Sequence, residues 1–306
     1  MKAGSALRGP AETGVTGHGF TDADFAAIAR LAQQDFGLHL TSAKRDLVYS
    51  RLTRRLRQLG LSDFRSYCLI LESEGGAAER MEMLSALTTN VTHFFREEHH
   101  FNTLRDVVLP PMLAAARGGA RLRLWSAGCS AGQEPYSLAL TLLELCPDAA
   151  RLDIRILATD VDPVILARAK AGVYRDEEVK SLPAALQSRY LEPVRHDTRH
   201  FSIGAKPREL ISFGEMNLIG DWPIRGPFNV IFCRNVAIYF DRDTQARLWS
   251  RFAALIPAEG HLFIGHSERV AGPATALLQQ ADVTTYRRTG SVRAEAETPT
   301  REGTHR

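Results

Sequence analysis

Strand-like and helical segments alternate along the chain from about residue 121, and this alternation constrains the fold more than any other feature. The strand-like runs lie at 121–127, 154–160, 228–234, 261–267 and 283–288. Helical patterns follow the first three runs, from Pro135, Pro163 and Thr244. Alternation of this kind is typical of a mostly parallel sheet with helices on both faces. We therefore predict a doubly wound α/β domain whose ligand lies at the carboxyl ends of the strands.

The first ninety residues have a different pattern. Apolar residues recur at helical spacing after the capping signature Thr21–Asp24, and three further helices are predicted at 42–59, 62–74 and 78–88. We predict four divisions of the chain. They are a flexible extension at 1–20, a helical domain at 21–90, an α/β domain at 91–288 with a β subdomain at about 175–213, and a disordered tail at 289–306.

Composition excludes several classes of protein. The 306 residues carry a net charge of +3, no apolar run is long enough to span a bilayer, and residues 1–20 lack the apolar core of a secretion signal. The four cysteines are scattered without a C-x-x-C pair, so we predict free thiols and no zinc site. We expect a cytoplasmic, monomeric protein with no membrane insertion and no metal.

The stretch WSAGCSAGQEPYS, residues 125–137, joins the first strand to its helix through a glycine turn. It has neither the G-x-G-x-x-G spacing nor a Walker loop. Pro135 removes a backbone donor from the helix start, and Glu134 would repel a phosphate but attract a cation. Asp160, at the end of the second strand, would either accept the two hydroxyls of a ribose or cap the following helix. A nucleoside with a positive charge fits this pattern, and S-adenosylmethionine is such a ligand.

A second polar group of residues lies in ALTTNVTHFFREEHHF, residues 86–101. Its phenylalanines are expected in the core, and its threonines, asparagine and Arg96 either cap a linker or form a site. A guanidinium binds a carboxylate through two hydrogen bonds, so Arg96 is a candidate for carboxylate recognition. The histidines at 99 and 100 follow two glutamates, which is a weak metal signal.

The third feature is the basic helix KRDLVYSRLTRRLRQLG, residues 44–60. Its cations are either a solvated surface or a docking site for an acidic partner. No aromatic residues interleave the arginines, which disfavours nucleic acid. The candidate docking residues are Arg51, Arg54, Arg55 and Arg57.

Several long motifs together resemble the chemotaxis receptor methyltransferases, the CheR family. They are T-T-N-x-T-x-F-F-R at 88–96, G-C-S-x-G-x-E-P-Y-S at 128–137, F-C-R-N-V-x-I-Y-F at 232–240 and G-H-S-E at 265–268. The resemblance covers about residues 21–287. It implies a helical domain joined to an S-adenosylmethionine-binding domain with a β subdomain. It also implies methylation of glutamate side chains on the helical cytoplasmic part of chemoreceptors, with S-adenosylhomocysteine as the product.

The resemblance also assigns roles to residues. The cofactor-binding residues it implies are Asn90, Thr92, Arg96, Glu134, Asp160, Asn217, Leu218, Arg234 and Asn235. Glu134 would hold the methionine amino group and Asp160 the ribose. Arg96 and Tyr239 would lie nearest the reacting atoms, and the basic helix would dock the receptor.

Two other functions compete with this interpretation. A methyltransferase for RNA or small molecules would need stacking aromatics or an N-P-P-Y motif after the third strand, where this chain has C-R-N-V. A non-catalytic sensor could bind S-adenosylmethionine and a receptor without transferring a methyl group.

Overall fold

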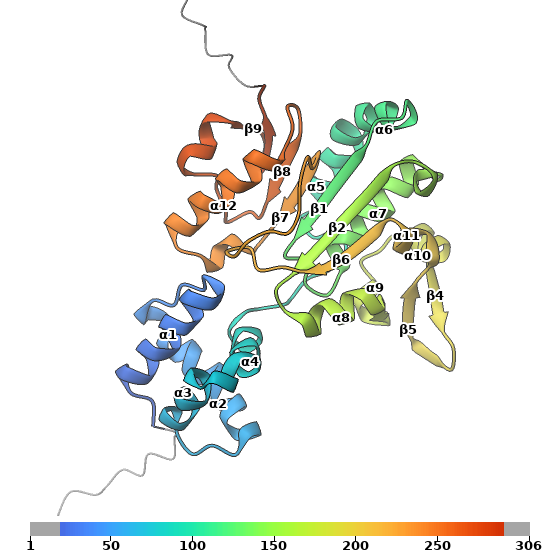
Figure 1. Ribbon diagram of the computed structural model, residues 1–306. Helices are drawn as coiled ribbons and strands as arrows, with labels where there is room; N and C mark the ends of the chain where they lie inside the picture. Colours follow the sequence, from blue (N-terminus) through green and yellow to red (C-terminus); the bar gives the residue numbers. More distant parts are fainter. Residues whose placement is uncertain (1–18, 291–306) are drawn as a thin grey trace, which may run out of the picture. The chain divides into compact units, whose positions relative to one another are not determined.

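A computed structural model of the chain describes residues 19–290 (Figure 1). The predicted extension (1–20) and the predicted tail (289–306) lie outside the described residues, apart from residues 19–20 and 289–290. The chain divides into two compact units, which are described separately. Unit 1 extends to Asp35 and resumes at Leu40–Thr88; unit 2 contains Phe36–His39 and everything from Thr89 onward. No helix within 19–290 has both the length and the apolar character needed to cross a membrane.

Unit 1 consists of helices, as predicted. They are α1 (Asp22–Phe36), α2 (Arg45–Leu59), α3 (Phe64–Glu72) and α4 (Ala77–Leu87). The capping signature works as expected, because Thr21 and Asp24 bond reciprocally at the start of α1. Gly60 ends α2 in the left-handed conformation. The apolar faces of the helices meet in a core that includes Ile28, Leu52, Leu56, Phe64 and Met83.

Unit 2 is built on a mostly parallel seven-stranded sheet, which confirms the predicted fold class. The strands are β1 (Leu122–Ala127), β2 (Ile154–Asp160), β6 (Ile211–Glu215), β7 (Val230–Cys233), β8 (His261–Ile264), β9 (Leu278–Asp282) and β10 (Thr285–Arg288). Their order is β6-β2-β1-β7-β8-β10-β9. The first five strands in this order, β6 to β8, are parallel to one another, and β10 is antiparallel to both β8 and β9. The sequence analysis did not identify β9.

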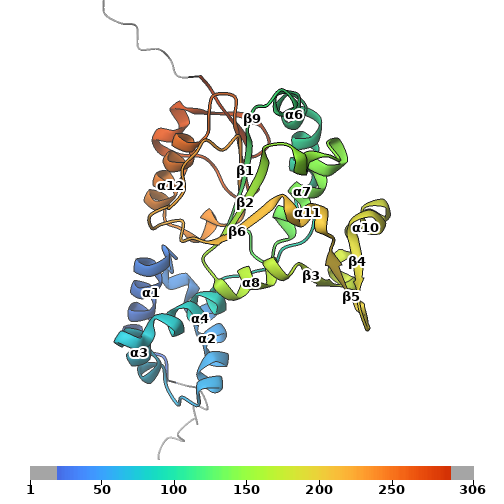
Figure 2. The same cartoon turned by 45° about the vertical axis from the view of Figure 1, so that its right-hand side comes forward.

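Helices cover both faces of this sheet. They are α5 (Glu98–Thr103), a π-helical turn (Leu104–Val108), α6 (Leu109–Arg117), α7 (Gln133–Leu145), α8 (Pro163–Ala171) and α12 (Arg242–Leu255). Alternate residues of each strand enter different cores: Leu124 packs in the core of α6 and α7, while Trp125 packs in the core of α12. Figure 2 shows α12 on one side of the sheet and α6 and α7 on the other.

A small antiparallel sheet is inserted after α8, as predicted. It has the order β3-β5-β4, from β3 (Val173–Arg175), β4 (Leu191–Val194) and β5 (Asp197–Ile203). The short helices α9 (Asp176–Val179), α10 (Ala184–Tyr190) and α11 (Ala205–Glu209) lie around it in sequence. Residues 209–213, ELISF, fall within the predicted range of this subdomain, but Ile211–Glu215 forms β6 and pairs in parallel with β2. β6 is the edge strand of the large sheet, so some of its polar residues are exposed. This polar pattern resembles that of a strand in a small surface subdomain, which explains the wrong prediction.

Candidate functional site

The glycine turn after β1 is held against the end of β2. The main-chain N–H groups of Gly128 and Cys129 both donate to the carbonyl of Thr159 at 2.8 Å. Gly128 and Gly132 have φ of 83° and 95°, a region that favours glycine. A Cβ atom on Gly128 would also lie 2.4 Å from Val236 Cγ2. The turn therefore requires glycine at residue 128, both for its backbone angle and for its contact with the loop after β7.

Glu134 forms a buried ion pair with Arg234. Arg234 Nη1 lies 3.2 Å from Glu134 Oε2, and Ser126 Oγ donates to Glu134 Oε1 at 2.7 Å. The side chains of Arg234 and Glu134 are 2% and 12% exposed. Burial raises the pKa of Glu134, while the Arg234 charge opposes that rise. The sequence showed no partner for Glu134; the structure supplies one from the loop after β7, 100 residues later.

Asp160 is the last residue of β2, so it lies at the carboxyl ends of the parallel strands, which we call the carboxyl edge of the sheet. Its Oδ2 accepts the N–H of Ser130 at 2.8 Å, and its Oδ1 accepts the N–H of Asp162 at 3.1 Å. The cap of α8 is Asp162, which accepts from Val164 and Ile165. The capping alternative considered for Asp160 therefore belongs to Asp162. Burial raises the pKa of Asp160, and its hydrogen bonds to main-chain N–H groups oppose the rise.

The segment 89–97 crosses the same edge of the sheet. Ser130 Oγ donates to the Asn90 carbonyl at 3.4 Å, and Arg234 donates to the Arg96 carbonyl. Tyr239 Oη accepts the N–H of Thr89 at 3.0 Å. These contacts bring the predicted residues Asn90, Arg96 and Tyr239 to the glycine turn and to the loop after β7.

The Arg96 side chain is half-buried, and its Nη1 donates to the Val91 carbonyl at 3.0 Å. Thr92, in the same segment, is also half-buried. One hydrogen bond leaves most of the guanidinium donors of Arg96 available for a carboxylate.

Asn217 and Leu218 follow β6, beside Asp160. The N–H of Met216 donates to the Asp160 carbonyl at 2.9 Å, which places the next two residues at this edge. Asn217 Oδ1 accepts the N–H of Ile219 at 3.1 Å, and Leu218 is buried in the core of α12. The hydrogen bond of Asn217 to Ile219 and the burial of Leu218 therefore fix the turn that follows β6.

Three residues of the site had no predicted role. Ser126 binds Glu134, Glu97 lies 3.5 Å from Arg234 Nη2, and Glu268 accepts four main-chain N–H groups. Glu97 belongs to a weak metal-like cluster with His99 and His100, whose candidate ligand atoms lie within 4.8 Å of one another. The Arg234 guanidinium stands beside this cluster and would repel a second cation, so an ion-pair network accounts for it.

The candidate docking arginines of unit 1 fall into two pairs. Arg55 makes a bidentate ion pair with Glu79 at 2.6 and 2.8 Å, and Arg51 donates to the carbonyls of Leu87 and Thr88. Arg54 and Arg57 are exposed, and within residues 19–290 they form no ion pair. The sequence analysis gave all four arginines the same candidate docking role, because the partners of Arg51 and Arg55 are distant in the chain.

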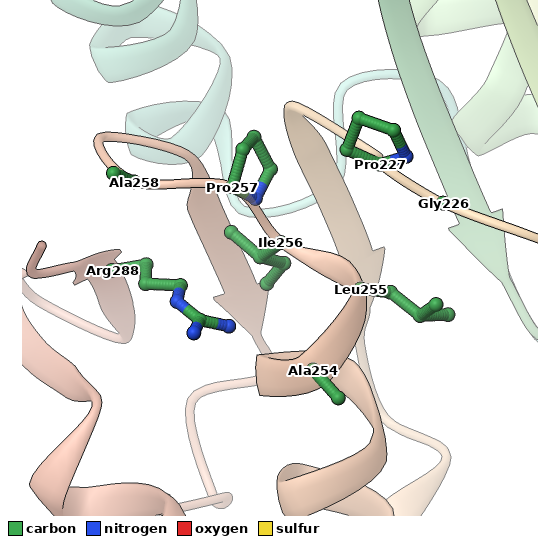
Figure 3. Close-up of a pocket in the computed structure, with 8 residues that line it drawn as sticks. All are labelled: Gly226, Pro227, Ala254, Leu255, Ile256, Pro257, Ala258 and Arg288. Carbon is green, nitrogen blue, oxygen red and sulfur yellow. The ribbon is translucent and has the colours of Figure 1, made fainter. Parts of the chain in front are cut away.

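A hollow of about 480 Å³ lies at the opposite edge of the sheet, where β7 and β8 begin (Figure 3). Gly226, Pro227, Arg288 and the segment 254–258 line it. None of the predicted site residues lines this hollow.

The carboxyl ends of the strands thus combine a glycine turn, a largely buried acid in the first turn of α7, a second acid at the end of β2 and a crossing polar segment. This arrangement is that of an S-adenosylmethionine-binding domain of the methyltransferase class. Family comparison agrees. Residues 90–287 match the model of the CheR methyltransferase, SAM binding domain, and residues 23–88 match that of the CheR methyltransferase, all-alpha domain. The chain belongs to the CheR methyltransferase family.

Curated relatives extend over most of the chain. It is 52% identical to a probable chemotaxis protein methyltransferase of Rhizobium etli, over 83% of this chain and 96% of that one. It is 42% identical to the chemotaxis protein methyltransferase of Escherichia coli, over 81% and 85% of the two chains. Chemotaxis protein methyltransferase 2 of Pseudomonas aeruginosa is 39% identical, over 87% and 93%. This chain is therefore an S-adenosylmethionine-dependent methyltransferase of chemotaxis.

Proposed function

We propose that this protein transfers the methyl group of S-adenosylmethionine to glutamate side chains of chemoreceptors and so forms glutamyl methyl esters. The observation that carries the proposal is the Glu134–Arg234 ion pair at the glycine turn, with Arg96 and Tyr239 reaching the same edge. The methionine part of S-adenosylmethionine is a zwitterion, and such a pair offers a negative charge for its ammonium group and a positive charge for its carboxylate.

The residues of this edge fit S-adenosylmethionine. Arg234 Nε is buried without a hydrogen-bond partner among the described residues, so it can donate to the methionine carboxylate. Glu134 is partly exposed and can accept from the ammonium group. Asp160 uses one main-chain donor on each oxygen and retains lone pairs for the ribose hydroxyls. Asn90, Thr92, Asn217, Leu218 and Asn235 would complete the cofactor site, as the family resemblance implies.

The chemistry requires alignment and no general base. A glutamate side chain titrates near pH 4 and is already ionised at neutral pH. When bound, S-adenosylmethionine supplies a methyl group activated by its sulfonium, and S-adenosylhomocysteine is the product. Arg96 and the Tyr239 hydroxyl would orient the incoming carboxylate. A single contact from each leaves the carboxylate oxygen nucleophilic, whereas a tight bidentate ion pair would reduce its reactivity.

We propose that the exposed face of α2 docks the helical cytoplasmic part of the receptor. Arg54 and Arg57 are exposed there and have no ion-pair partner in the described part of the chain. Long-range attraction between their charges and an acidic helix would speed association. Arg51 and Arg55 would contribute to docking indirectly. Arg55 binds Glu79 of α4 and Arg51 binds the carbonyl of Leu87 at the end of α4, so both hold α2 against α4. Such a protein would act in the cytoplasm as a monomer, without nucleic acid.

Methyl-labelled S-adenosylmethionine and receptor-containing membranes test the reaction. We expect label in the receptor that is released as volatile methanol in mild base, the property of a methyl ester. Base-stable label would indicate transfer to nitrogen. Cofactor binding without transfer would indicate a sensor. Label in added RNA but not in receptor would indicate a nucleic-acid methyltransferase.

The double variant Arg54→Glu, Arg57→Glu tests docking. We expect the apparent KM for receptor to rise about tenfold, while the affinity for S-adenosylhomocysteine stays unchanged. Asp46→Asn, on the same helix, is the control for an ordinary charge change. If the double variant keeps the wild-type KM and its dependence on salt, α2 is not the docking surface.

A further inference from the structure

Glu268 is a buried carboxylate whose hydrogen-bond partners, among residues 19–290, are main-chain N–H groups. It is 3% exposed. Its Oε2 accepts from the N–H groups of Gly265 at 2.6 Å and Asn235 at 3.1 Å, and its Oε1 accepts from those of Val236 at 3.1 Å and Ile238 at 3.2 Å. Three of these four donors lie in the loop after β7, so one side chain from the neighbouring strand end holds that loop.

The loop, Arg234–Tyr239, carries much of the site. Arg234 pairs with Glu134, and Tyr239 reaches Thr89. Asn235 has φ of 60°, a left-handed conformation that costs energy for a residue with a side chain. Such a conformation persists only where the surroundings determine it, and the Glu268 contact with the N–H of Asn235 is one such determinant.

Two glycines enclose the same loop. A Cβ atom on Gly265 would lie 2.6 Å from Asn235 Nδ2 and 2.8 Å from its main-chain nitrogen. A Cβ atom on Gly128 would overlap Val236. The loop is therefore closely packed between the ends of β1 and β8, and the carboxylate fixes it along its main chain.

We propose that Glu268 is a positioning residue for methyl transfer: by binding the N–H groups of Asn235, Val236 and Ile238, it sets the loop so that Asn235 meets the cofactor and Tyr239 meets the receptor glutamate. This inference rests on the proposed function. An ionised carboxylate suits the task because it has acceptor sites for all four donors, and an amide does not. Leaving buried N–H groups without an acceptor costs as much as a lost hydrogen bond, so the loop would move.

The variant Glu268→Gln tests this role. It preserves the shape of the side chain but turns an NH₂ group toward two of the four donors. We expect amide hydrogen exchange at 235–238 to accelerate. The dissociation constant of S-adenosylhomocysteine, from calorimetry, should rise roughly tenfold to a hundredfold. We also expect kcat to fall more than the KM for receptor changes, since the docking helix is untouched.

Two further variants separate positioning from general stability. Glu268→Asp keeps the charge but shortens the reach; it should give an intermediate loss, and it carries the test if Glu268→Gln does not fold. Asp24→Asn removes a buried carboxylate of unit 1 that also accepts a main-chain N–H. That control should lower Tm without changing the affinity for S-adenosylhomocysteine.

The outcomes distinguish this inference from the function on which it rests. If both Glu268 variants lower Tm but bind S-adenosylhomocysteine and turn over receptor as the wild type does, Glu268 only stabilises the fold and the inference is wrong. If the wild type itself binds no S-adenosylhomocysteine, the proposed function fails and the inference fails with it.

Discussion

The carboxyl edge and the amino edge of the large sheet, where its parallel strands end and begin, differ in the residues that form them. At the carboxyl edge, Glu134, Asp160 and Glu268 are acids whose pKa values are raised by burial. The segments between them include Ser130 and Asn235, which have positive φ. At the amino edge, the hollow of about 480 Å³ is lined by alanine, leucine, isoleucine and proline, with Arg288 as its charged member.

The difference shows that the volume of a hollow does not by itself locate the cofactor site in this protein, because none of the predicted cofactor-binding residues lines the hollow at the amino edge. Buried charges and left-handed backbone cost free energy, so they persist where surrounding contacts compensate for them. At the carboxyl edge those contacts come from four separate strand ends and one crossing segment. Substitutions at the two edges should therefore have very different effects on cofactor binding.

Glu134→Gln should have the largest effect at the carboxyl edge. It removes the charge expected to meet the ammonium group and leaves Arg234 buried without its partner. We expect the affinity for S-adenosylhomocysteine to fall about a hundredfold, about 2.8 kcal/mol, in calorimetry. Ser126→Ala is the matched control, because it removes one hydrogen bond from Glu134 and keeps the charge; its effect should be well under tenfold. Equal effects of the two variants would contradict the role of the charge.

Gly265→Ala should have the next largest effect, and it tests the geometry of the edge without changing any charge. The added methyl group would overlap Asn235, whose main chain cannot move away without disturbing the bonds to Glu268. We expect receptor methylation to fall more than tenfold, measured at saturating cofactor, since the Tyr239 end of the loop would be displaced. Gly214→Ala, where nothing lies within 4 Å, should keep nearly full activity. Wild-type activity in Gly265→Ala would show that the loop tolerates displacement.

The sequence predicted that the site lies at the carboxyl edge, but it did not predict the side-chain contacts there. The alternation of strands and helices gave the parallel sheet, and the carboxyl ends of parallel strands necessarily meet at one edge. The pairing of Glu134 with Arg234 depends on the strand order, which local pattern does not encode. The same limitation hid the Arg55–Glu79 ion pair, the place of β6 and the role of Glu268, because each depends on contacts between residues distant in the chain.

Asp160→Ala should weaken cofactor binding by about tenfold, less than Glu134→Gln, because ribose hydroxyls are neutral donors. Asp162→Ala is the control that the structure offers. It removes the cap of α8 and should cost about 1 kcal/mol of stability with little change in affinity. Calorimetry with S-adenosylhomocysteine and thermal unfolding separate the two aspartates. Unchanged affinity in Asp160→Ala would count against its ribose role.

Ala254→Leu should have the smallest effect, and it tests the comparison from the other edge. Ala254 is an exposed residue near the end of α12 and lines the hollow in Figure 3. Leucine suits a helix and would partly fill the hollow, so stability should change by no more than about 0.5 kcal/mol. The affinity for S-adenosylhomocysteine should stay within about twofold of the wild type. A larger loss of affinity, with Tm unchanged, would mean that the two edges are coupled through β7 and β8, and the amino edge would then have to be counted as part of the functional site.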